Sequence, residues 1–182
     1  MPARFPAATI GPRHRQLVFR WELTDGELVA RGDGAARLAP PDSARLDFFM
    51  AAGMGGVAAV LIGGQLRAPG ADFLQRMVPQ SAMLWAALGR LAIPPLPDTV
   101  ARVEGSTFRA DIGTPVAWRV TFEDGKLRRV ERVEGGRVQE WVERAIDGRV
   151  RYRNTRDRRS LDLVITKSEE VPPFDAAVFT FP

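Results

Sequence analysis

Gln16-Leu-Val-Phe-Arg-Trp-Glu-Leu23 is the stretch of this sequence that decides its fold class. Apolar side chains stand at every second position, and they are Leu17, Phe19, Trp21 and Leu23. A period of two puts these side chains on one face of an extended chain and predicts a half-buried strand. Asp25-Gly26, which follows at once, is a signal for a tight hairpin turn. The sequence therefore predicts an antiparallel hairpin with one apolar face.

The same alternation and the same kind of turn signal recur along most of the chain. Four more strands are predicted before residue 70, at 27–39 (bent at Gly32-Asp-Gly34), 44–50, 57–62 and 65–68. Later strands are predicted at 100–104, 107–112, 116–123, 126–134, 137–145, 149–156 and 160–167, with a last extended piece at 178–181. Serial hairpins form an antiparallel meander, and one this long must curl to bury a face. The expected fold is mainly β, an incomplete antiparallel barrel of about 11 strands.

Two short helices are predicted after the fifth strand, where the spacing of the apolar residues changes. The first begins at Asp72, which can cap its N-terminus, and ends at Pro79. The second covers residues 82–91, can be capped by Ser81, and is apolar nearly all round. A helix of that kind must be covered, so we expect it to lie over the mouth of the curled sheet.

Length and composition indicate one globular domain, which we place at residues 16–182. The chain has 182 residues, of which 45% are hydrophobic and 26% charged, as in ordinary globular proteins. Residues 1–15 hold three prolines and are expected to form a flexible lead-in. The absence of cysteine excludes disulfides, thiolate metal sites and cysteine nucleophiles, and the single histidine, His14, leaves no histidine metal cluster.

Membrane spans and export signals have characteristic lengths that this sequence does not show. The longest apolar runs fall short of the roughly 20 residues that cross a bilayer. Residues 1–6, Met-Pro-Ala-Arg-Phe-Pro, lack the apolar core of a signal peptide. Two interpretations stay open: a cytosolic protein, or an exported one whose signal was trimmed and replaced by Met1.

The order of these elements resembles the LolA/LolB family of bacterial lipoprotein-localisation proteins over about residues 16–182. The most specific stretch is Ala44-Arg-Leu-Asp-Phe-Phe-Met-Ala-Ala-Gly-Met-Gly-Gly-Val-Ala-Ala-Val-Leu-Ile62. In the LolB-like branch, two strands at this place are joined by a loop that projects one apolar residue, usually Leu followed by Gly. Met54-Gly55 stands at the matching position. The helical block and Val171-Pro-Pro-Phe-Asp175 before a last strand are also similar.

The resemblance implies an incomplete barrel, closed on one side by helices, whose apolar cavity holds lipoprotein acyl chains. It implies a place in the periplasm or on the periplasmic face of the outer membrane, given a trimmed export signal. The lipid-bearing cysteine of LolB-type receptors is absent, and the second half is richer in arginine than the family pattern. The same fold also serves envelope-stress sensors, so a sensor or protein-interaction domain with a closed, packed core is the alternative.

Met54 is the first candidate site residue. Within the resemblance it is a protruding apolar residue that touches a membrane or a cargo acyl chain. Exposed apolar tips are costly in water unless a partner covers them. The other interpretation is a turn whose methionine folds into the core.

Ten apolar residues are candidate liners of a lipid cavity. They are Leu17, Phe19, Trp21, Phe48, Leu61, Leu84, Trp85, Leu88, Trp118 and Phe122. For each residue alone, a packed core is the simpler interpretation. Taken together, many short strands under a helix favour an apolar pocket. Met77 and Met83 would add a lining that adapts to acyl chains of varying shape.

A run of arginines is the third candidate. Residues 126–160 hold 12 basic and 6 acidic side chains, while the whole chain carries +4. Arg149, Arg151 and Arg153 share one face of a predicted strand and could attract anionic lipid head groups. Nucleic acid is less suited as a partner, because basic barrels that bind it interleave several aromatic residues with the cations. The plainer interpretation is a solvated outer face with carboxylate partners such as Glu140 and Glu143.

Catalytic signals are weak throughout. A Ser-His-Asp arrangement would have to use His14, and Gly53–Gly56 runs into a predicted strand instead of the helix that a phosphate cradle needs. The expected function is therefore non-enzymatic binding of lipoprotein acyl chains or another lipid. We expect a monomer with a peripheral contact to a membrane surface, and no cofactor, metal or nucleic acid.

Overall fold

The computed structural model describes residues 5–53, 55–69, 78–93 and 96–180. Within these ranges, twelve strands form one antiparallel sheet in the order β5-β4-β3-β2-β1-β12-β11-β10-β9-β8-β7-β6. The first six are β1 (Arg15–Asp25), β2 (Leu28–Ala39), β3 (Ser43–Met50), β4 (Gly56–Ile62), β5 (Gln65–Arg67) and β6 (Val100–Glu104). The others are β7 (Thr107–Ile112), β8 (Trp118–Glu123), β9 (Lys126–Glu134), β10 (Arg137–Arg144), β11 (Arg149–Asn154) and β12 (Arg159–Glu170).

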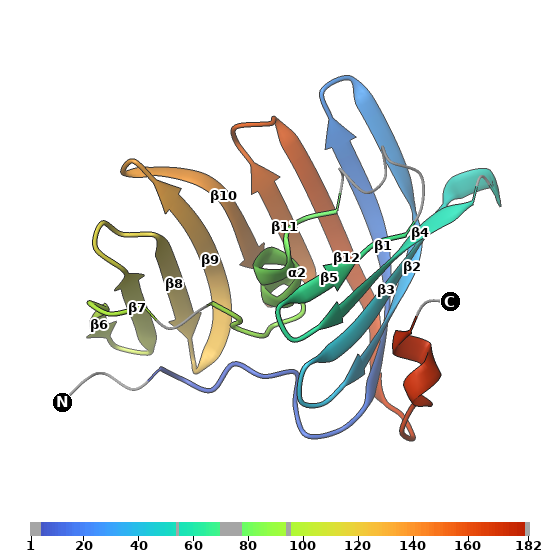
Figure 1. The fold of residues 1–182 in the computed structure, drawn as a ribbon, viewed down its shortest axis with the longest axis horizontal. Helices are drawn as coiled ribbons and strands as arrows, with labels where there is room; N and C mark the ends of the chain where they lie inside the picture. The colour runs from blue at the N-terminus through green and yellow to red at the C-terminus, as the bar shows by residue number, and fades with distance from the viewer. Residues whose placement is uncertain (1–4, 54, 70–77, 94–95, 181–182) are drawn as a thin grey trace.

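The sheet curls into an unclosed half-barrel, with β5 and β6 as its two edges (Figure 1). Two meanders, β1–β5 and β6–β12, are joined where the first and last strands pair, from Arg15 opposite Glu170 to Asp25 opposite Arg159. The predicted incomplete antiparallel barrel is confirmed. The described chain has twelve strands where about 11 were expected.

Alternation in β1 gives the sheet its apolar inner face. Leu17, Phe19, Trp21 and Leu23 are all 7% exposed or less, as the period of two predicted. In the neighbouring β12, Leu161 and Leu163 are buried opposite Leu23 and Trp21. The buried side chains of adjacent strands therefore form one continuous surface on the concave side.

The glycines of β2 allow β1 and β3 to pack closely against it. A Cβ atom on Gly34 would lie 2.3 Å from Cε2 of Phe19. A Cβ atom on Gly32 would lie 1.8 Å from the carbonyl oxygen of Phe49. A side chain at either position would collide with the neighbouring strand, so only glycine is accommodated there. Both glycines lie within the continuous strand β2.

Helix α2 (Ser81–Ala87) follows β5 and lies on the concave face, where a covering helix was expected (Figure 1). The predicted helix ran to residue 91, and the observed one is shorter. Gly89 adopts a left-handed φ of 91°, its N–H donates to Ala86 O, and Arg90 N–H donates to Trp85 O. This pair of bonds is a Schellman motif, which ends a helix. Its N-cap is Gln80 instead of the expected Ser81, and the helix predicted from Asp72 begins outside the described residues.

The two ends of the chain pack on opposite faces of the sheet. Within the predicted lead-in, Ile10 is 5% exposed and joins the main core, and Ala8 O accepts a hydrogen bond from Leu91 N at 3.1 Å. At the other end, the predicted extended piece 178–181 was wrong. A 3-10 helix, η2 (Ala176–Phe179), forms there, because the Asp175 side chain accepts a hydrogen bond from Ala177 N at 2.8 Å and caps it. Among the described helices, none has the length and apolar character to cross a membrane.

Candidate functional site

The concave face brings the predicted cavity liners together. Nine of them are 8% exposed or less and belong to one cluster: Leu17, Phe19, Trp21, Phe48, Leu61, Leu84, Trp85, Leu88 and Phe122. Trp118 is partly buried and packs against the same cluster. The signals in the sequence were the alternation of the strands and, for Leu84, Trp85 and Leu88, a helix that is apolar nearly all round. Their role in binding a ligand stays a prediction.

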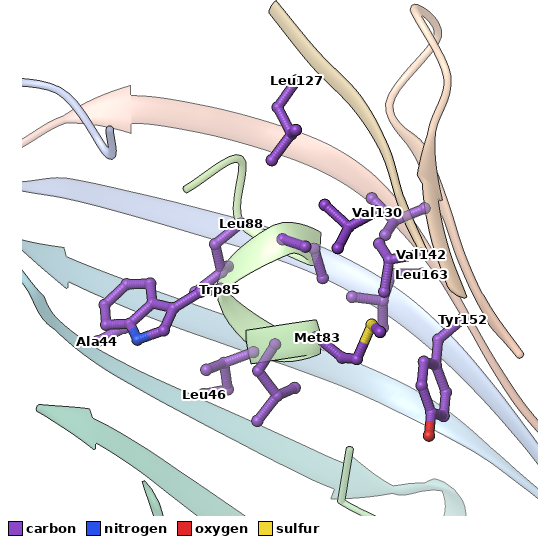
Figure 2. Packing of buried hydrophobic residues seen from close by; sticks show 14 of the residues in the cluster. Ala44, Leu46, Met83, Trp85, Leu88, Leu127, Val130, Val142, Tyr152 and Leu163 are labelled. Carbon is purple, nitrogen blue, oxygen red and sulfur yellow. The ribbon is translucent and has the colours of Figure 1, made fainter. Parts of the chain in front are cut away.

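Helix α2 occupies the centre of this face. Met83, Leu84 and Trp85 are at most 1% exposed. In Figure 2, Trp85 points toward Ala44 and Met83 points toward Tyr152, on the other side of the helix. The helix has the sequence Ser-Ala-Met-Leu-Trp-Ala-Ala, with no charged side chain. The inner face is thus mainly apolar around α2, on the sheet and on the helix that covers it.

Two polar contacts tie α2 to the sheet. Near its C-terminal end, the indole Nε1 of Trp85 donates a hydrogen bond to Gly63 O at 2.7 Å, in the turn between β4 and β5. At its N-terminal end, Gln80 Nε2 donates to Glu140 Oε1 on β10. The helix therefore bridges the two halves of the curled sheet.

Glu140 is the centre of a buried polar network. It is 4% exposed and accepts hydrogen bonds from Arg132 Nε at 2.7 Å and from Tyr152 Oη at 2.7 Å. Burial, and then the hydrogen bond to Glu140, raises the pKa of Tyr152 well above its usual range. The expectation that Glu140 pairs with the outer-face arginines was wrong. It shares the inner face of β10 with Val142, two residues away, and that parity was the available signal.

Two hollows flank α2. The larger has a volume of about 480 Å³ and lies between the N-terminal segment, β1, β9, β10 and the C-terminal end of the helix. Its lining includes apolar residues, namely Leu17, Leu38, Leu88, Leu127 and Ile165, and basic residues, namely Arg15, Lys126, Arg128 and Arg144. The smaller, of about 30 Å³, is apolar and is lined by Trp21, Leu23, Ala30, Phe48, Val57, Val78, Pro79 and Leu161. Sequence reasoning missed Arg128 and Arg144, because their strands also carry outward-facing arginines.

The arginines predicted to attract head groups lie on the convex face of β11. Arg149 and Arg151 are exposed, while Val150 and Tyr152 between them are buried. Arg153 forms an ion pair with Asp162 at 2.6 Å, and Arg149 forms one with Asp147 at 3.4 Å. These arginines therefore point away from the apolar face, and their attraction for head groups stays a prediction.

The other sequence candidates are placed as follows. Met54 lies outside the described residues. Of the described residues on either side of it, Met50 donates a backbone hydrogen bond from its N–H to Gly55 O at 2.9 Å. His14 accepts a hydrogen bond from Phe174 N at its Nδ1, 3.1 Å away, and thereby holds the C-terminal segment. The described ranges hold no group of three or more His, Asp or Glu side chains that could bind a metal ion.

Comparison with known proteins gives likeness at the level of structure. No protein-family profile and no curated protein sequence matches this chain. A LolA superfamily protein from Nitrosomonas europaea is similar, with a TM-score of 0.57, 12% identity and coverage of 98% of this chain and 92% of the other. A DUF1329 family protein from Desulfovibrio piger is similar, with a TM-score of 0.58, 9% identity and coverage of 94% and 91%. The half-barrel covered by α2 is therefore a fold that this chain shares with both of these proteins.

Proposed function

We propose that this chain binds an acyl chain of a lipid or lipoprotein against the concave face of the half-barrel. The binding needs no covalent chemistry. Each methylene removed from water contributes roughly 0.8 kcal/mol, and the cargo would leave when a more apolar environment, such as a membrane, accepts it. The periplasm or the periplasmic face of the outer membrane is the proposed place of action.

The observation that carries this proposal is the apolar inner face under an uncharged helix. A seven-residue helix is too short to be stable alone in water, so its position depends on packing and on the two polar ties. Breaking those ties would uncover apolar residues of the strands that α2 contacts, β9, β10 and β11, where Val130, Val142 and Val150 are at most 2% exposed. An acyl chain can take the place of α2 there, because the buried part of the helix is mainly apolar.

Two further observations support the proposal. The larger hollow lies next to the C-terminal end of α2, and Leu17, Leu88 and Leu127 form the apolar part of a lining that also carries four basic residues. Its volume of about 480 Å³ lies within the usual range for small-molecule sites. The likeness to a LolA superfamily protein supports a lipoprotein over other classes of ligand, and thus a lipoprotein carrier or receptor.

Fluorescence quenching by a brominated fatty acid tests the proposal directly. The chain has four tryptophans, and Trp85 lies on the inner face while Trp141 lies on the outer face, stacked under Arg129 at 4.2 Å. Variants that keep only Trp85 or only Trp141, with phenylalanine at the other three positions, separate the two faces. We expect saturable quenching of Trp85 and none of Trp141. Equal quenching of both, or of neither, would contradict the proposal.

The second candidate is a protein-interaction or sensor domain with a permanently closed core. The complete burial of Met83, Leu84 and Trp85 favours it, because nothing needs to move in such a domain. It predicts that an acyl chain leaves Trp85 fluorescence unchanged and that partners bind the outer face. The quenching experiment therefore decides between the two candidates.

A further inference from the structure

The larger hollow holds two arginines in an unusual setting, beside the C-terminal end of α2. Arg144, at the end of β10, and Arg128, near the start of β9, both line it. In each, the Nε atom is buried and has no hydrogen-bond partner among the described residues. Buried donors are normally satisfied, so two such atoms in one hollow call for an explanation.

Gly89 has no side chain, and this leaves room for Arg144 at the C-terminal end of the helix. A Cβ atom on Gly89 would lie 2.3 Å from Nη1 of Arg144, so the guanidinium occupies the space that any other residue would fill. Burial lowers the pKa of Arg144, and the charge of Arg128 lowers it further. The two cations therefore repel each other inside the fold.

Arg128 reaches the same hollow through an irregularity in the sheet. Leu127 pairs with Phe122 and Arg129 pairs with Thr121, so Arg128 is the extra residue of a β-bulge. Its Nε lies 3.9 Å from the carboxylate of Glu123, and that carboxylate is half exposed to solvent. A long ion pair with an exposed partner compensates a buried charge poorly.

The other residues that line the hollow are positively charged or uncharged. Arg15 and Lys126 are the other charged residues of the described lining, which contains no acidic side chain. Arg15 already donates to Ser168 Oγ at 2.6 Å. Leu17, Leu88 and Leu127 form apolar wall next to the two guanidinium groups. The hollow thus places cationic hydrogen-bond donors beside apolar side chains.

We propose that Arg128 and Arg144 bind the oxyanion head group, a carboxylate or a phosphate, of an amphiphile whose chain lies along the adjacent apolar wall. Such an anion would accept hydrogen bonds from both guanidinium groups and end their mutual repulsion. This assignment rests on the proposed function for the apolar half of the ligand. It adds a requirement for negative charge, at residues distinct from the arginines of β11.

Calorimetry with four probes on the full chain tests the assignment. Dodecanoate and dodecyl phosphate carry the anion, dodecyltrimethylammonium carries the same chain with the opposite charge, and inorganic phosphate carries no chain. We expect the two anionic amphiphiles to bind at least tenfold more tightly than the cationic one. Arg144→Gln and Arg128→Gln should each weaken dodecanoate binding roughly 10- to 100-fold, the usual effect of losing a charged hydrogen bond.

The matched control is Arg137→Gln, an exposed arginine at the far end of β10, which should bind all four probes as the parent does. Equal binding of anionic and cationic amphiphiles, or unchanged dodecanoate binding in both variants, would overturn the head-group assignment and leave acyl binding intact. Inorganic phosphate that binds as tightly as dodecyl phosphate would overturn the amphiphile assignment. If no twelve-carbon probe binds, the proposed function fails together with it. Circular dichroism verifies that each variant is folded.

Discussion

The indole Nε1 of Trp85 lies 2.7 Å from the carbonyl oxygen of Gly63 and donates a hydrogen bond to it. This bond joins the C-terminal half of α2 to the turn between β4 and β5, which belongs to one edge of the sheet. Glu140 holds the start of the helix to β10 from the other half of the sheet. The position of the cover therefore depends on one contact with each half.

Trp85→Phe tests whether that tie controls access to the inner face. Phenylalanine keeps an aromatic ring in the core but cannot donate to Gly63, so the free energy of unfolding should fall by about 1–3 kcal/mol. A looser helix should admit a fluorescent fatty acid faster, as measured by stopped flow. Trp141→Phe, on the outer face, is the control and should leave the rate of fatty-acid uptake unchanged. A slower uptake in Trp85→Phe would contradict the role of α2 as a movable cover.

Met54→Glu tests the loop that the family resemblance singles out. We expect the variant to fold, because the glycines around Met54 in Gly53-Met-Gly-Gly56 predict a turn. We expect it to lose transfer of lipid to vesicles, because a carboxylate opposes contact with acyl chains. Leu28→Glu is the matched control, since Leu28 is an exposed apolar residue beside another turn, 46% exposed. Transfer at the parental rate in Met54→Glu would remove the loop from the mechanism.

Tyr152 is the single tyrosine of the chain, so its ionisation can be followed alone by ultraviolet absorbance. Burial and the hydrogen bond to Glu140 raise its pKa in the folded state. We expect no tyrosinate absorbance at pH 10, where an exposed tyrosine is half ionised. A midpoint near 10 in the folded protein would contradict the buried network around Glu140.

The same shift makes stability depend on pH in a defined direction. The folded pKa lies above the unfolded value of about 10, so the contribution of Tyr152 is complete below that pH. As the pH rises past 10, the unfolded chain loses the proton first, and the free energy of unfolding falls by up to about 1.4 kcal/mol per pH unit. Tyr152→Phe should remove this fall, which urea denaturation at pH 8 and at pH 10.5 can measure.

Gly34→Ala tests the close packing of β1 on β2. The new methyl group would lie 2.3 Å from the Phe19 ring and 2.9 Å from the carbonyl oxygen of Asp47. Overpacking of this kind lowers the free energy of unfolding by about 1–3 kcal/mol. Gly64→Ala is the control, because no atom lies within 4 Å of its added methyl group. Equal stability of the two variants would show that the sheet relaxes around residue 34.

Much of the sheet could be predicted because strand periodicity is a local signal. Leu17, Phe19, Trp21 and Leu23 show it directly, and hairpin turns such as Asp25-Gly26 fix which strands are neighbours. The pairing of β1 with β12 brings the first and last strands together, and no local pattern specifies such a contact. The end of α2 was placed four residues late, because Leu88 and Leu91 continue the apolar pattern beyond the Schellman motif at Gly89.

The site was predictable only in its apolar part. Strand periodicity assigns six of the nine buried liners to the inner face, and the apolar helix α2 with its C-cap contributes Leu84, Trp85 and Leu88. The positions of Glu140, Arg128 and Arg144 could not be assigned from apolar residues, because they depend on strand parity and on a bulge. The bulge at Arg128 shifts the strand register, although the sequence shows only two consecutive arginines there. Polar residues on an inner face are exceptions to the alternation of apolar and polar side chains. A prediction from that alternation therefore assigns them to the outer face.

Native mass spectrometry of the protein purified from a bacterial host, followed by organic extraction, tests the central claim most directly. We expect a bound fatty acid or phospholipid near one per chain, or uptake of added dodecanoate at that ratio by protein that is purified empty. An empty mass together with no uptake of dodecanoate would contradict it, and would show that the inner face is a closed core.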